Sequence, residues 1–156
     1  MKRIINNYKE NNFKNSIKII TIIFLLSRLP LLIYMIIKKD ISIITYFDGT
    51  SYISIAKYGY IKEKLCAFFP LYPLLIRLLN TIIHSYEISG FLISNACSFM
   101  SLIIINKIIK KDNLYNDIVF IFSPIMIFST IVYSESLFMF LTLFTTLILS
   151  LQVLYK

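Results

Sequence analysis

The chain has 156 residues, of which 58% are hydrophobic and 15% are charged, and its formal net charge is +8. A helix that crosses a bilayer core about 30 Å thick needs roughly 20 consecutive apolar residues, and several runs here approach that length. These features exclude a soluble domain and predict an all-α, polytopic membrane protein. The lysines lie at the ends of the apolar runs, so the positive charge indicates topology signals and contacts with anionic membrane lipid, with no nucleic-acid partner.

The N-terminal part predicts a retained signal anchor. Residues 1–16 are polar and basic, and the apolar run 17–37 is too long for the hydrophobic region of a cleaved signal peptide. Arg28 lies near Pro30 within this run, and two interpretations stay open. Either the helix bends and Arg28 reaches a neighbouring helix, or Arg28 binds a lipid phosphate. The spacing of Cys66 and Cys97 predicts neither a disulfide nor a metal site.

The loop 38–87 is predicted to carry two short helices on the membrane surface. The first covers 49–58, with Asp48 as its N-terminal cap and Gly59 as its stop. A carboxylate at a helix N-terminus near water stays ionised and can accept a proton. The second covers 68–83. Its prolines and its polar residues suit a surface helix better than a lipid-facing one, and leaving it out of the spans keeps more basic residues on the cytosolic side.

The remaining apolar runs predict three more spans. They cover 88–109, 118–132 and 136–155, with a bend at Ser123-Pro124 in the middle one. This topology places the loop 38–87 and the turn before Glu135 on the same, exoplasmic side. The whole chain, 1–156, is then a single membrane module with four spans.

Two acids at membrane boundaries are the candidates for chemistry. For Asp48 a purely structural role as a helix cap stays open, and Glu135 can equally serve as a first-turn acid of the last span. His84 is interpreted as a solvated loop residue. The aromatic residues of the loop indicate an interfacial belt, with a sugar platform as the alternative; they are Tyr58, Tyr60, Phe68, Phe69 and Tyr72.

At these residues the chain resembles the GPI mannosyltransferase II (PIG-V) family. The first luminal loop of that family is matched by Phe47-Asp48-Gly49, Tyr52-Ile53, Ile55-Ala56, Tyr58-Gly59-Tyr60, Glu63, Ala67-Phe68-Phe69-Pro70, Pro73 and Arg77. A second motif is matched by Ser123-Pro124 and by Tyr133-Ser134-Glu135-Ser136-Leu137-Phe138. Phe47 stands where the family usually has tryptophan, which keeps an aromatic ring but loses the indole N–H.

The resemblance implies a GT-C glycosyltransferase of the endoplasmic reticulum membrane with an exoplasmic first loop that carries surface helices. Its donor would be dolichyl phosphate mannose and its acceptor a GPI-anchor precursor that receives the second mannose, with no metal or other cofactor and with room for an accessory membrane subunit. Asp48 would be the general base, and Glu135 would position the acceptor. Arg77 would either stabilise the leaving phosphate or anchor a surface helix. Tyr52, Tyr133 and Tyr60 would contact substrate.

Two other functions stay open at this point. GT-C enzymes have many more than four spans, so we expect a fragment or a reduced copy, and a non-catalytic subunit or pseudoenzyme would keep the same motifs. A small transporter would instead use Arg28 and Glu135 as intramembrane charges.

Overall fold

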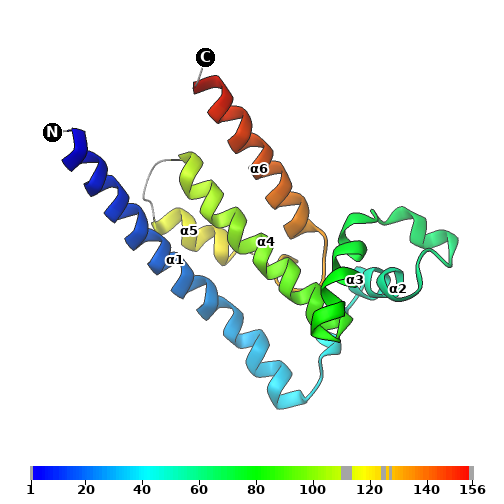
Figure 1. Ribbon diagram of the computed structural model, residues 1–156. Coiled ribbons are helices and arrows are strands. Elements are labelled where there is room, and N and C mark those ends of the chain that lie inside the picture. Colours follow the sequence, from blue (N-terminus) through cyan, green and yellow to red (C-terminus); the bar gives the residue numbers. More distant parts are fainter. Residues whose placement is uncertain (1, 110–113, 124–125, 127, 155–156) are drawn as a thin grey trace.

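The computed structural model describes residues 2–109, 114–123, 126 and 128–154, and within these ranges its regular elements are all helical. The elements are α1 (Lys2–Lys38), η1 (Ser42–Thr45), α2 (Asp48–Tyr58), η2 (Glu63–Ala67), α3 (Leu71–Ile83), α4 (Tyr86–Ile109), α5 (Leu114–Ile121) and α6 (Glu135–Leu154). Figure 1 shows α1 and α4 side by side in opposite directions, with α2 and α3 gathered at the end where α4 begins. The all-α fold class is therefore confirmed.

Three of the described helices are long and apolar enough to cross a bilayer. These segments are Ile17–Lys38, Tyr86–Ile108 and Glu135–Gln152. They lie close to the predicted spans 17–37, 88–109 and 136–155. Together with the apolar composition of the chain, they indicate an integral membrane protein. The shorter apolar helix α3 is not among them. The bounds of α2 and α3 are close to those of the predicted surface helices 49–58 and 68–83.

The structure differs from the prediction at the third span. Instead of one helix over 118–132, α5 ends at Ile121. The described residues from Phe122 to Val132 form turns and bends, with a 3₁₀ turn at Met126, and we call them the non-helical segment. A helix of eight residues is about 12 Å long and does not cross a bilayer by itself. The sequence provides a reason for the break, because Ser123 precedes Pro124 and a residue before proline is disfavoured in the helical region.

The non-helical segment nevertheless returns the chain along α4. Ile121 packs in one cluster with Leu102 of α4, whereas Val132 lies against Gly90, nearer the start of the same helix. Leu102 and Gly90 are separated by about 18 Å at the helical rise of about 1.5 Å per residue. The segment therefore carries the chain from the far part of α4 back to the end where α6 begins.

The polar backbone of this segment is bonded within the protein. The Val132 N–H donates to the Ile44 carbonyl at 2.8 Å, and the Asn95 side chain donates to the Thr130 carbonyl at 2.9 Å. Ser94 Oγ donates to the Tyr133 carbonyl at 3.0 Å. Non-helical backbone at membrane depth is tolerated only where protein or water satisfies it. These bonds explain how a segment without a continuous α-helix can pack against the long helices.

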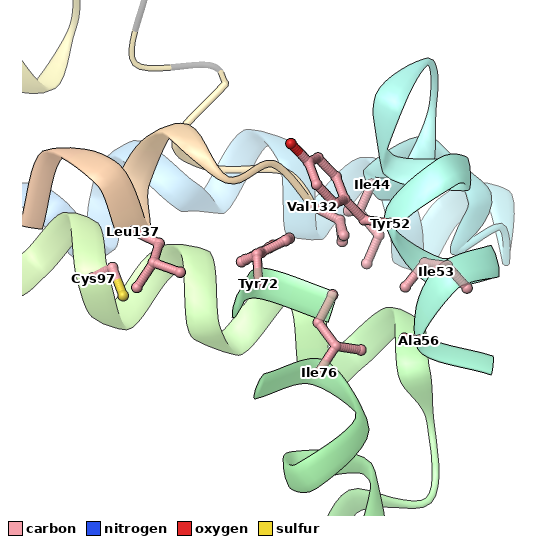
Figure 2. Packing of buried hydrophobic residues seen from close by; sticks show 9 residues of the cluster. All are labelled: Ile44, Tyr52, Ile53, Ala56, Tyr72, Ile76, Cys97, Val132 and Leu137. Carbon is pink, nitrogen blue, oxygen red and sulfur yellow. The ribbon is translucent and has the colours of Figure 1, made fainter. Parts of the chain in front are cut away.

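Val132 is the point where the segment is fixed between two helices. Its side chain is fully buried in the main core cluster, and Figure 2 shows it beside Ile44. A Cβ added at Gly90 of α4 would lie 2.7 Å from Val132 Cγ1, and one added at Gly49 of α2 would lie 3.0 Å from the Val132 carbonyl oxygen. The two glycines therefore allow both helices to approach the segment closely.

The α2–α3 pair is fastened to the start of α4. The Lys57 ammonium forms an ion pair of 2.8 Å with Glu87. Tyr72 of α3 is buried, and its hydroxyl donates to the Gly90 carbonyl at 3.0 Å and lies 2.6 Å from Ser94 Oγ. Burial raises the pKa of the Tyr72 phenol, so this link stays neutral at physiological pH. These contacts fix the position of α2, and with it the position of its first residue, Asp48.

Candidate functional site

Asp48 is the first residue of α2, and the structure corrects its predicted role as a cap. The capping position belongs to Phe47, and no side-chain capping hydrogen bond is made there. Phe47 has a φ of 54° and a ψ of −121°, and a positive φ is strained for an aromatic residue. The Asp48 side chain is exposed, and no described residue donates a hydrogen bond to its carboxylate. The structure therefore leaves this carboxylate available to a ligand.

The turn before α6 approaches α2 at this point. The Asp48 N–H donates to the Tyr133 hydroxyl at 3.3 Å, and the Tyr52 hydroxyl lies 2.6 Å from Ser134 Oγ. Glu135 follows as the first residue of α6, with an exposed side chain. We call these five residues, Asp48, Tyr52, Tyr133, Ser134 and Glu135, the acidic corner. It joins residues that are more than 80 positions apart in the chain.

The two carboxylates act electrostatically on the same phenols. Burial raises the pKa of Tyr133, and the negative charges of Asp48 and Glu135 raise it as well. Burial likewise raises the pKa of Tyr52, again with contributions from Glu135 and Asp48. Both phenols therefore remain protonated and can donate a hydrogen bond. The corner combines exposed carboxylates with neutral hydroxyl groups, a combination suited to binding a sugar and removing a hydroxyl proton.

Apolar cavities open on two sides of the acidic corner. One of about 330 Å³ lies between α3 and α6, and Ser134 and Glu135 line it together with Phe69 and Phe138. The other, of about 930 Å³, lies between α1 and the non-helical segment, and Tyr46 and Phe47 line it next to Asp48. Both volumes suit the apolar part of a lipid. Two lipids could therefore reach the corner from different sides.

Arg77 lies away from the acidic corner. Its Nε donates to the Ala56 carbonyl at 2.7 Å, and its Nη2 donates to the Ile55 carbonyl at 3.2 Å. These carbonyls belong to the last turns of α2, whereas Asp48 begins that helix about 12 Å earlier. A cation at a helix C-terminus stabilises the helix. Of the two roles predicted for Arg77, the structure supports the anchor of a surface helix.

The other predicted aromatic residues take different places. The Tyr60 hydroxyl donates to the Phe68 carbonyl at 2.8 Å and so ties the loop between α2 and α3. Tyr58 and Phe69 are exposed, as an interfacial belt requires, but Tyr72 belongs to the core. Phe68 and Tyr72 each contact the Tyr52 ring edge-on, with ring centroids 5.0 Å apart. They hold Tyr52 in place beside Ser134. His84 is exposed and ends α3 in a left-handed conformation.

Sequence reasoning missed the residues of α4 that hold the corner. The Ser94 hydroxyl bonds both to the Tyr72 hydroxyl and to the Tyr133 carbonyl. The side chain of the next residue, Asn95, donates to the Thr130 carbonyl. The signal was present in the apolar run, where small or polar residues recur at helical spacing on one face. They are Gly90, Ser94, Cys97, Ser98 and Ser101, and all are buried.

Fold and corner together define a helical membrane protein with an acidic site at one end of its helices. The family model for mannosyltransferases of the PIG-V type matches residues 15–152. The chain therefore belongs to the PIG-V mannosyltransferase family, and the resemblance identified in its two motifs is confirmed. Membership supports a mannosyltransferase role with a lipid-linked sugar donor and a glycolipid acceptor. Comparison with curated proteins and with solved structures gave no match.

Proposed function

We propose that the protein is a GT-C mannosyltransferase on the luminal side of the endoplasmic reticulum membrane. It transfers mannose from dolichyl phosphate mannose to a GPI-anchor precursor and adds the second mannose. The observation that carries this proposal is the exposed Asp48 carboxylate, which has no hydrogen-bonding partner among the described residues and lies next to Tyr133 at the acidic corner.

The proposed reaction is a displacement at the anomeric carbon of mannose. An acceptor hydroxyl of the GPI precursor attacks this carbon and gives its proton to Asp48. The new bond joins the acceptor oxygen to the anomeric carbon, while the bond from that carbon to the phosphate oxygen breaks. Dolichyl phosphate leaves with the electron pair. Tyr52, Tyr133 and Glu135 would orient the sugar and the acceptor, because their polar groups face the same corner.

The two cavities support a reaction between two lipids. Donor and acceptor both carry long apolar chains, and both cavities have mostly apolar walls. The smaller cavity is lined by Ser134 and Glu135, and the larger one by Phe47, which precedes Asp48. If each lipid entered through its own cavity, the sugar of one and the hydroxyl of the other would meet while the two apolar chains stay apart. Positioning of this kind accounts for a large part of the rate enhancement in two-substrate enzymes.

The test uses microsomes from cells that lack the second GPI mannosyltransferase and express this protein. We expect radiolabelled dolichyl phosphate mannose to convert a GPI precursor with one mannose into the species with two. GDP-mannose, supplied where synthesis of the dolichyl donor is blocked, should give no product. Absence of the two-mannose product despite normal expression would contradict the proposed donor and acceptor.

A further inference from the structure

A second charged site lies on α1, where Arg28 is buried next to the larger cavity. Arg28 is only 6% exposed, and its guanidinium stacks over the Phe24 ring with 4.2 Å to the ring centroid. It donates to Asn95 at 2.9 Å, to Ser27 at 3.3 Å and to Ser98 at 3.4 Å. All of these partners are neutral, and no described carboxylate forms an ion pair with Arg28.

A buried cation without a counter-charge is costly. An uncompensated charge inside a protein or a membrane destabilises the fold. The neutral hydrogen bonds offset part of this cost, yet they use only some of the N–H donors of a guanidinium. An anion that binds only in the functional complex would supply the missing charge.

The position of Arg28 along the helices fits a ligand that also reaches the acidic corner. Arg28 bonds to Asn95, and the preceding residue of α4, Ser94, bonds to the Tyr133 carbonyl at 3.0 Å. Arg28 therefore lies at the same level along α4 as Tyr133 and close to the level where α6 begins. Sequence places Arg28 near the middle of the first span, and the packing sets it close to the level along α4 at which α6 begins.

The larger cavity has both Arg28 and the residues before Asp48 in its lining. Ser27 and Arg28 line it from α1, Tyr46 and Phe47 line it from the stretch that precedes Asp48, and apolar walls come from residues such as Leu31 and Ile131. Its volume of about 930 Å³ is large enough for several isoprene units. A lipid with its chain in this cavity would hold a phosphate beside Arg28 and a sugar towards Asp48.

We propose that Arg28 binds the phosphate of the polyprenyl-phosphate sugar donor, whose chain occupies the cavity between α1 and the non-helical segment. The identity of this lipid rests on the proposed function. Arg28 thus takes the role of stabilising the leaving phosphate. Arg77 of α3 is bound to carbonyls in the last turns of α2, away from the acidic corner. A positive charge aimed at the leaving group stabilises the charge that develops there during transfer.

The test measures lipid retention by native mass spectrometry of the purified full chain. The probes are a polyprenyl phosphate, the polyprenol of the same length, and phosphatidic acid. We expect at least tenfold higher occupancy for the polyprenyl phosphate than for either of the others. Arg28→Gln should bind the polyprenyl phosphate no better than the polyprenol, and the matched change of an exposed cation, Lys62→Gln, should keep the full preference.

A second variant covers the case in which Arg28→Gln does not fold. Ile131→Trp fills the cavity but leaves the hydrogen bonds of Arg28 in place, so it should lower retention of both prenyl lipids at least fivefold at an unchanged melting temperature. Equal retention of phosphate and alcohol by the unmutated chain would overturn the inference. So would undiminished retention by Ile131→Trp, or equal binding of phosphatidic acid.

The inference and the proposed function fail in different ways. A chain that prefers polyprenyl phosphate but makes no two-mannose product would contradict the proposed function and support the site at Arg28. A chain that makes the two-mannose product but shows no preference for polyprenyl phosphate would support the proposed function and contradict the site at Arg28.

Discussion

Replacing Asp48 by asparagine should abolish mannose transfer while leaving the fold intact. The amide keeps the size of the side chain but cannot take the proton of the acceptor hydroxyl. Removing a general base lowers the rate by roughly 10²–10⁴-fold. The fold should not change, because no described residue donates a hydrogen bond to this carboxylate and the backbone N–H that bonds to Tyr133 is retained.

The measurement is rescue of surface GPI-anchored proteins in cells that lack the second GPI mannosyltransferase, at matched expression. Asp40→Asn is the matched control. This acid lies in the same loop, and the Ser42 N–H bonds to it at 2.8 Å and lowers its pKa. Asp40→Asn should rescue as well as the unmutated protein, whereas Asp48→Asn should not. Equal rescue by both variants would remove Asp48 from the reaction.

Gly90→Ala should cause the largest loss of stability among single-methyl additions at the described glycines. The added Cβ would lie 2.7 Å from Val132 Cγ1, 3.1 Å from Val132 Cγ2 and 3.3 Å from Ile76 Cδ1. Val132 cannot easily withdraw, because it is fully buried and its N–H is bonded to Ile44. Overpacking of this kind costs roughly 1–3 kcal/mol.

The loss is measured as the midpoint of thermal unfolding in detergent, together with a compensating variant. Val132→Ala removes both methyl groups that the new Cβ would meet. The double variant Gly90→Ala/Val132→Ala should therefore be more stable than the sum of the two single effects implies, since residues in contact are not additive. A Gly90→Ala chain that melts at the unmutated temperature would show that the non-helical segment is not held against α4 in this way.

Much of the helical framework follows from composition and residue type. The long spans are visible as apolar runs, and the surface helices follow from the glycine and proline residues around Asp48 and Arg77. Placing Asp48 and Glu135 together required only the topology count and the second motif. The structure does bring these acids near the same tyrosines.

The break in the predicted third span could not be predicted from hydropathy. An apolar run measures only whether side chains tolerate lipid, and the run at 118–132 satisfies that test whether or not its backbone is helical. What decides the backbone is whether partners such as Asn95 and Ile44 can bond it in place of a helix. The hydrogen bonds of Arg77 could not be predicted for a similar reason. Their acceptors are backbone carbonyls, which every residue carries, so the sequence does not indicate which of them Arg77 contacts.

The proposed function requires Asp48 and Glu135 to face the lumen together. In a chain with Cys66→Ser and Cys97→Ala, single cysteines at Asp48, Glu135 and Lys107 are treated with a membrane-impermeant thiol reagent in sealed microsomes. All three native side chains are exposed. The cysteines at positions 48 and 135 should react only after the vesicles are opened, whereas the one at 107 should react at once. Labelling of either acid position in sealed vesicles would place that residue in the cytosol and contradict a luminal transfer site.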